Sequence, residues 1–167
     1  MAKIASGASQ GTPAVRGSAT HGADPEAAAG ASRPRGLRRP PLDEQLLLHA
    51  AELVARGWCR EAPAEDMLGR EVDPWSGAAR RWTPLGALVR AWCDTGGDRI
   101  EAFTTAYLAL ALAVGGTVSD WNAEPWRTKE DATAALERAR EHLPSARDYE
   151  RTLRRDHERR AERAEAF

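Results

Sequence analysis

The chain has 167 residues, 24 basic and 25 acidic side chains, and a formal net charge of −1 at pH 7. Its longest uncharged apolar run is shorter than the about 20 residues that a membrane-spanning helix needs, and residues 1–20 lack the apolar stretch of a secretory signal. We therefore expect a cytoplasmic protein with no part in the membrane. Residues 42–167 carry 18 basic and 23 acidic side chains, so nucleic acid is not expected to be the main partner of the folded part.

Residues 1–41 are rich in Ala, Gly, Ser, Pro and Arg and contain no aromatic residue. Their larger aliphatic residues are Ile4, Val15 and Leu37, which are too few to offset the entropy of ordering the backbone. We predict a disordered arm that ends in the basic, proline-rich stretch 33–41. This arm could dock a partner or contact nucleic acid, but a solvated tail is the simpler interpretation.

A first helix is predicted for residues 44–56, with Asp43 as its N-cap and Gly57 as its stop. Its apolar residues recur at helical spacing and predict a buried face made of Leu46, Leu47, Ala50, Leu53 and Val54. Residues 58–81 are irregular. A turn around Gly69 predicts either a small β-hairpin or only a loop, and Trp75 and Trp82 are expected to fold back onto the helices.

A second helix is predicted to begin at Thr83, an N-cap that is followed by Pro84 at the first helical position. Its apolar stripe is predicted to consist of Leu85, Leu88, Val89 and Trp92. Gly86 lies in the first turn, where the missing Cβ permits close approach of another backbone segment.

The stretch 98–116 has no charged residue after Glu101 and ends in two glycines. Asp98 and Glu101 form a D-x-x-E start that is close to a capping box, and Gly115 provides the stop. A helix that is apolar on all sides has to be covered on several sides. We therefore predict that residues 98–116 form the central helix of the domain.

Residues 117–127 are predicted to form a compact loop. Thr128 then caps an edge helix that runs to about His142, and Pro144 is expected to break or kink it because proline removes a backbone donor. Residues 146–167 are almost all charged, apart from Tyr149 and Leu153, which could pack. They predict a solvated helix held by charge pairs, namely Glu150 with Arg154 and Asp156 with Arg160.

Six tryptophans lie between residues 58 and 126. Each can bury about 150–250 Å², so most of them are expected in the core. Trp121 and Trp126, however, lie in the polar stretch 117–127, where a pure packing role is less expected. The sequence therefore leaves room for an aromatic-lined pocket at this stretch.

The densest polar and aromatic group in the chain is Ser119-Asp-Trp-Asn122 followed by Arg127. Arg127 precedes a predicted helix N-terminus, which is a favourable place for an anion. This group could form a binding loop for a small anion or a peptide. With Trp58 it could form a small-molecule pocket, for which we name four candidate binding residues: Trp58, Trp121, Asn122 and Arg127. The alternative is that these polar groups only satisfy and cap their own turn.

The spacing of reactive side chains does not predict catalysis. Cys59 and Cys93 suit small, buried residues in the reduced form, and a nucleophilic Cys–His pair would need a contact in space. The sequence has no C-x-x-C or H-x-x-x-H spacing for a metal and no Gly-rich phosphate loop after a strand. We predict no catalytic residue, no metal and no cofactor.

Residues 42–143 resemble a family of small uncharacterised bacterial domains found largely in actinomycetes. The resemblance rests on three short motifs, which are Arg56-Gly-Trp58, Leu85-Gly-Ala-Leu88, and Trp121-Asn122 followed by Arg127-Thr128. Members typically read Trp-Asn-Asp, whereas this chain has Ala123 in the third place, and many carry a cysteine before the Gly-Ala-Leu element that this chain lacks. The resemblance implies domain boundaries and no established activity.

These patterns predict a mainly α, single-domain bundle of about four core helices with a possible short β-hairpin. The predicted organisation is a disordered arm 1–41, a helical core 42–143 and a charged, solvated helix 144–167. The leading hypothesis is a non-catalytic cytoplasmic interaction or accessory module with a protein partner. The alternatives are a small-molecule-binding protein or enzyme with a pocket at the four candidate residues, and weak nucleic-acid binding through the arginine-rich arms.

Overall fold

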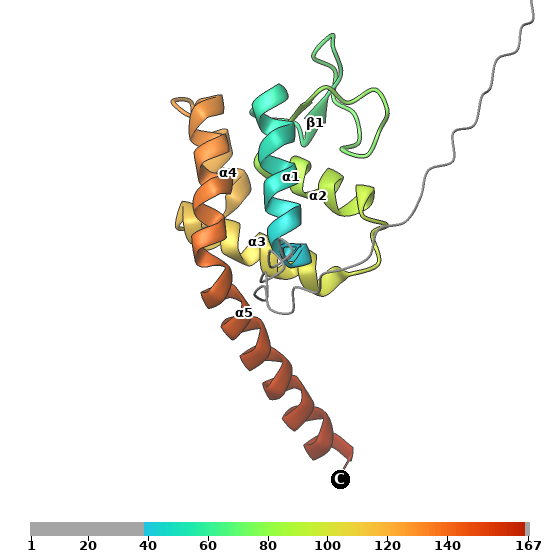
Figure 1. The fold of residues 1–167 in the computed structure, drawn as a ribbon, viewed down its shortest axis with the longest axis vertical. Coiled ribbons are helices and arrows are strands. Elements are labelled where there is room, and N and C mark those ends of the chain that lie inside the picture. The colour runs from blue at the N-terminus through green and yellow to red at the C-terminus, as the bar shows by residue number, and fades with distance from the viewer. Residues whose placement is uncertain (1–38, 166–167) are drawn as a thin grey trace, which may run out of the picture. The chain divides into compact units, whose positions relative to one another are not determined.

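A computed structural model describes residues 39–165 and shows a mainly helical domain with a two-stranded sheet (Figure 1). The helices are α1 (Leu42–Arg56), α2 (Pro84–Asp94), α3 (Ile100–Val114), α4 (Val118–Ala123) and α5 (Lys129–Glu165). Strands β1 (Ala64–Glu65) and β2 (Arg81–Trp82) pair antiparallel, with Ala64 opposite Trp82. The predicted fold class is confirmed. The prediction of disorder for the arm falls, up to residue 38, outside the described residues.

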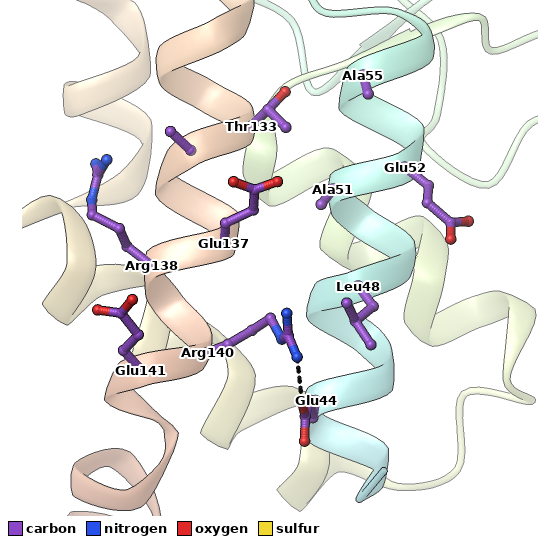
Figure 2. A pocket seen from close by; sticks show the side chains of 11 residues that line it. Glu44, Leu48, Ala51, Glu52, Ala55, Thr133, Glu137, Arg138, Arg140 and Glu141 are labelled. Carbon is purple, nitrogen blue, oxygen red and sulfur yellow. Dashed lines mark hydrogen bonds and ion pairs between the residues drawn. The ribbon is translucent and has the colours of Figure 1, made fainter. Parts of the chain in front are cut away.

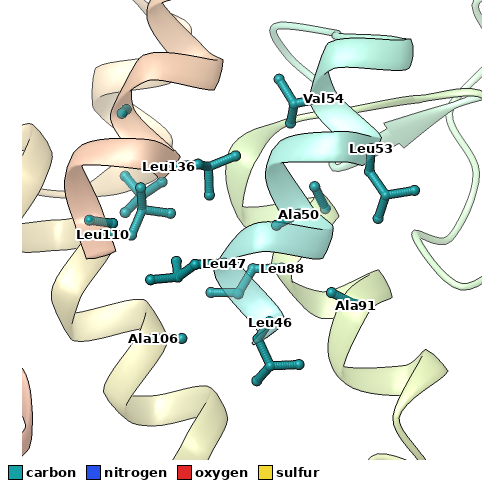
Figure 3. Packing of buried hydrophobic residues seen from close by; sticks show 14 of the residues in the cluster. Leu46, Leu47, Ala50, Leu53, Val54, Leu88, Ala91, Ala106, Leu110 and Leu136 are labelled. Atoms are coloured by element: carbon teal, nitrogen blue, oxygen red, sulfur yellow. The ribbon is translucent and has the colours of Figure 1, made fainter. Parts of the chain in front are cut away.

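The centre of the domain is α1. This helix packs against α2, α3, α5 and β2, and the five residues predicted for its buried face are all buried. Figure 3 shows how they meet Leu88 of α2, Leu110 of α3 and Leu136 of α5. The helix begins one residue before Asp43, which is not its N-cap as predicted but lies in its first turn.

Residues 98–116 contain a helix as predicted, and α3 packs against α1, α2, α4 and α5, but it is not covered on every side. The buried residues of α3 are small or confined to one side, namely Thr105, Ala106, Ala109 and Leu110, while Ile100 and Leu112 are exposed. The alanines allow close approach of a neighbour on that side, and the opposite side stays open. Gly115 does stop the helix, with a left-handed φ of 75° and its N–H donating to Ala111 O. Asp98 does not cap the start, since the N-cap residue is Arg99 and no side chain caps it.

Helix α5 continues through Pro144 as one element and changes direction about half-way along (Figure 1). Its start is the predicted cap: the Asp131 N–H donates to Thr128 Oγ1 and the Thr128 N–H donates to Asp131 Oδ2, each at 3.1 Å. The helix is not an edge element, because it packs against both α1 and α3. Beyond Leu153 it is exposed and extends away from the bundle.

Ion pairs between residues one helical turn apart run along the exposed half of α5. The predicted pair of Glu150 with Arg154 is present at 2.7 Å, whereas Asp156 pairs with Arg159 at 2.6 Å and not with Arg160. Tyr149 and Leu153 are exposed, so the expectation that they pack is wrong within the described residues.

Candidate functional site

The four candidate binding residues converge at α4. The stretch 117–127, predicted as a loop, contains this short helix, and its Trp121 and Asn122 are buried. Asn122 Oδ1 accepts a hydrogen bond from Trp58 Nε1 at 3.0 Å, and Asn122 Nδ2 donates to Arg60 O at 2.6 Å and to Cys59 O at 3.4 Å. The residues joined by these three hydrogen bonds are a different set from the four candidates. We call this set the Asn122 junction, and it consists of Trp58, Cys59, Arg60 and Asn122. It joins α4 to the segment that follows α1.

Arg127, the fourth candidate residue, packs on the ring of Trp121. Its guanidinium carbon lies 4.3 Å from the centroid of the Trp121 ring, and its Nη2 lies 2.5 Å from Glu124 Oε2. Its Nε donates to Trp121 O at 3.3 Å, and Arg127 O accepts from Arg60 Nη2 at 3.2 Å. The four candidate residues lie close together in the structure, but Asn122 and Arg127 direct their polar atoms largely toward protein groups.

A cavity of about 550 Å³ lies beside the junction, and Asn122 is the one candidate residue that borders it. Its walls come from the first turns of α2, from α4 and from the segments 60–63 and 73–75. The apolar part of the lining includes Pro63, Pro74, Trp75, Leu85, Val89 and Val118. The volume falls within the about 300–1,000 Å³ of ligand pockets, which are mostly apolar with a few polar groups.

The shape of this cavity depends on the start of α2. Thr83 is the predicted N-cap, and its Oγ1 accepts from the Gly86 N–H at 2.9 Å. A Cβ on Gly86 would lie 1.8 Å from Pro63 O, so only glycine lets the segment 60–63 lie against this turn. The buried side of α2 includes Ala87, Leu88 and Ala91. Leu85 and Val89 line the cavity, and Leu85 also packs against the core.

Three cavity residues were missed as site residues by sequence reasoning, namely Trp75, Leu85 and Val89. Trp75 was expected to fold back onto the helices, but it is 55% exposed at the cavity. Leu85 and Val89 were assigned to the buried stripe of α2, yet both are only half-buried. The usable signal is the pair of alanines at 87 and 91, which marks a second face of α2 that can approach α1 more closely.

The family model described as a family of unknown function (DUF6197) matches residues 38–142. The chain belongs to this family. The matched residues contain the Asn122 junction, the cavity beside it, α1 to α4 and the first part of α5. No curated protein and no solved structure matches the chain.

Another hollow in this DUF6197 domain, about 810 Å³, lies between α1 and α5 (Figure 2). Leu48, Ala51 and Ala55 line it from α1, and Arg140 reaches across from α5 to Glu44, with 2.7 Å between Nη2 and Oε1. The remaining lining is mainly charged, and Figure 2 shows Arg138 and Glu141 extending away from α1. An ion-paired surface furrow of this kind needs no ligand to explain it.

The thiols do not supply a nucleophile at the site. Cys59 is buried, its Sγ donates to Ala62 O at 3.2 Å, and burial with the nearby charge of Glu65 raises the pKa of the Cys59 thiol to about 12. A thiol with so high a pKa stays protonated at neutral pH and is unreactive. Cys93 is free and half-buried. Among residues 39–165, no group of three or more His, Cys, Asp or Glu could hold a metal ion.

No helix among the described residues is both long and apolar enough to cross a membrane.

Proposed function

We propose that the domain is a non-catalytic cytoplasmic interaction module that binds a protein partner on the open side of α3. The observation that carries this proposal is an uncharged groove of about 680 Å³ between α3 and α5. It is lined by Leu108, Ala111, Leu112, Gly115, Gly116, Ser145, Ala146 and Tyr149. In a chain with 29% charged residues, a groove without one charged lining residue stands out.

Large apolar side chains are exposed at this groove. Leu112 is 50% exposed and Tyr149 is 54% exposed. Ile100 at the start of α3 and Leu153 further along α5 are exposed as well. Contiguous exposed apolar surface is typical of a protein interaction site, and a groove between two helices suits the apolar face of a partner helix.

Co-purification of the tagged full chain from its native host, followed by mass spectrometry, tests this proposal. The double variant Leu112→Ser/Tyr149→Ser should lose the partner that the unchanged chain retains. Met67→Ser/Leu68→Ser is the matched control, because these two residues are also large, apolar and exposed but lie on a turn. If both double variants retain the partner equally, the partner binds elsewhere and the proposal is wrong.

A second candidate function is the binding of a small molecule in the cavity beside the Asn122 junction. It is favoured by the ligand-sized, largely apolar cavity at which Asn122 lies. In this proposal Trp58, Trp121 and Arg127 support the wall rather than contact the ligand. Val89→Phe should fill the cavity and abolish the thermal stabilisation given by any ligand found in a metabolite screen, whereas Val72→Phe, away from this lining, should not.

Nucleic-acid binding through the arms gains no comparable support. Arg151, Arg154 and Arg159 of α5 each pair with a carboxylate one turn away, so the helix presents balanced charge rather than a basic stripe. The N-terminal arm lies outside the described residues up to residue 38.

A further inference from the structure

The cavity beside the Asn122 junction has an acidic lining as well as apolar walls. Its lining includes three carboxylates, from Glu61, Asp73 and Asp120, and one guanidinium, from Arg60. No ion pair links any of the three carboxylates to a basic group among the described residues. The charge at the cavity is therefore negative overall, although the cavity lies beside a helix N-terminus.

The one cation on the lining is engaged by the protein. Arg60 Nη2 donates to Arg127 O at 3.2 Å, and the Arg60 guanidinium carbon lies 5.5 Å from the centroid of the Trp58 ring. Arg60 Nε is buried and has no hydrogen-bond partner among the described residues. The contacts with Arg127 and Trp58 hold the guanidinium in place, so Arg60 offsets the carboxylates only in part.

Trp75 supplies a second feature that favours a cation. Its ring is the largest side chain on the lining, and more than half of its surface is open to solvent. An exposed indole face attracts ammonium groups through its quadrupole. Carboxylates and an indole on the lining of an apolar cavity together match a molecule with a positively charged head and an apolar body.

We propose that this cavity binds an organic ammonium compound, with the apolar body against Leu85 and Val89 and the ammonium group near Trp75 and the carboxylates. This inference rests on the second candidate function, binding of a small molecule in the same cavity, and adds the chemical class of the ligand. Neutral molecules of the same shape bind more weakly, and anions are disfavoured by the unpaired carboxylates.

Three probes with the same phenylbutyl body test the charge preference on the full chain: 4-phenylbutylamine, 4-phenylbutanol and 5-phenylpentanoate. Binding is measured by calorimetry and by tryptophan fluorescence at low ionic strength. The amine should bind roughly tenfold more tightly than the alcohol, and the carboxylate should bind most weakly. Asp73→Asn/Asp120→Asn should remove most of the amine preference and leave the alcohol affinity unchanged. Both positions are exposed, so folding should be retained.

The outcomes distinguish failure of the ammonium class from failure of small-molecule binding in the cavity. Equal binding of amine and alcohol, lost in Val89→Phe, would keep the cavity as a binding site and overturn the ammonium class. An amine preference that survives Asp73→Asn/Asp120→Asn and also Glu61→Gln would overturn it too. Absence of binding by all three probes would overturn both the ligand class and the small-molecule function. Trp75→Leu, which keeps an apolar side chain, should reduce the amine affinity alone.

Discussion

Arg147 of α5 binds Asp43 of α1 with two hydrogen bonds, from Nε to Oδ2 at 2.7 Å and from Nη2 to Oδ1 at 2.8 Å. The Asp43 carboxylate is nearly buried, and it raises the pKa of the Arg147 guanidinium above its ordinary value. The pair joins the first turn of the central helix to α5 just beyond Pro144. A planar, bidentate pair of this kind fixes both position and angle.

Arg147→Met should destabilise the domain, because it leaves the Asp43 carboxylate buried without its charged donors. Hydrogen bonds to charged groups contribute about 1.5–3 kcal/mol each in net terms, so a loss of about 2–3 kcal/mol is expected from urea unfolding followed by circular dichroism. Arg151→Met is the matched control. It removes an exposed pair with Asp148 and should change the free energy of unfolding by about 0.5 kcal/mol or less.

Gly86→Ala should be strongly destabilising. The new Cβ would lie 1.8 Å from Pro63 O and 2.7 Å from Pro63 C, which are backbone atoms that cannot swing aside. Overpacking of this kind costs about 1–3 kcal/mol, and a displaced segment 60–63 would also alter the cavity. Gly77→Ala should be neutral or stabilising by about 0.4–1 kcal/mol, because no atom lies within 4 Å of its added Cβ and its φ is not positive. Equal melting temperatures for the two variants would contradict the close approach.

Local signals made several parts of the fold predictable. The caps at Thr83 and Thr128 and the stop at Gly115 depend on neighbours within four residues, and the structure confirms all three. The choice of the central helix is not local. It depends on which helix faces pack together between segments that are far apart in the sequence. The alanines of α3 permit close packing on one side, while its other sides do not have to be buried. A count of apolar residues therefore overstated how completely α3 is covered.

The sequence pointed to the region of α4, but not to the contacts that its residues make. Asn122 stood out as a polar residue next to Trp121, yet its partners Trp58, Cys59 and Arg60 lie 62 to 64 residues earlier in the chain. No sequence spacing reveals that its amide group is used to join two segments. The cavity was missed because it depends on how far α2 is rotated about its axis, which the burial of Ala87 and Ala91 decides.

Asn122→Asp tests whether the hydrogen bonds of the Asn122 amide hold α4 to the segment that follows α1. The carboxylate can still accept from Trp58 Nε1, but it cannot donate to Arg60 O, so a buried carbonyl loses its partner and a charge is buried. A loss of about 2–4 kcal/mol is expected from chemical unfolding followed by tryptophan fluorescence. Asp120→Asn on the exposed side of α4 is the control and should lie within about 0.5 kcal/mol of the unchanged chain. An Asn122→Asp variant with an unchanged free energy of unfolding would show that the junction does not hold the two segments together.

Cys59 should resist alkylation while the chain is folded. In a Cys93→Ala background, iodoacetamide at pH 8 should label Cys59 only after urea is added, because burial raises the pKa of the folded thiol to about 12. The same shift predicts a pH effect. Below pH 9.0, the ordinary pKa of the thiol, Cys59 keeps its proton in both the folded and the unfolded chain. The contribution of the Cys59 thiol to the free energy of unfolding is then fully present. Between about pH 9 and 12 the unfolded thiol ionises first, so stability falls with rising pH.

Cys59→Ala should flatten this alkaline fall relative to the unchanged chain, apart from its constant packing cost. Parallel unfolding curves from pH 8 to pH 10.5 provide the comparison. Rapid labelling of folded Cys59, or an identical alkaline slope in Cys59→Ala, would contradict a buried, protonated thiol.

Pro144→Ala should stabilise α5. Proline inside a helix has no N–H to donate, and its ring clashes with the preceding turn, which makes it about 3 kcal/mol less favourable than alanine. Alanine also leaves the unfolded chain freer, so a net gain of about 1–2 kcal/mol is expected from urea unfolding followed at 222 nm. Ser145→Ala, the neighbouring exposed position, is the control and should gain less. A loss of stability in Pro144→Ala alone would mean that the change of direction in α5 is needed to place Arg147 on Asp43, and Arg147→Met added to that variant should then cost little more.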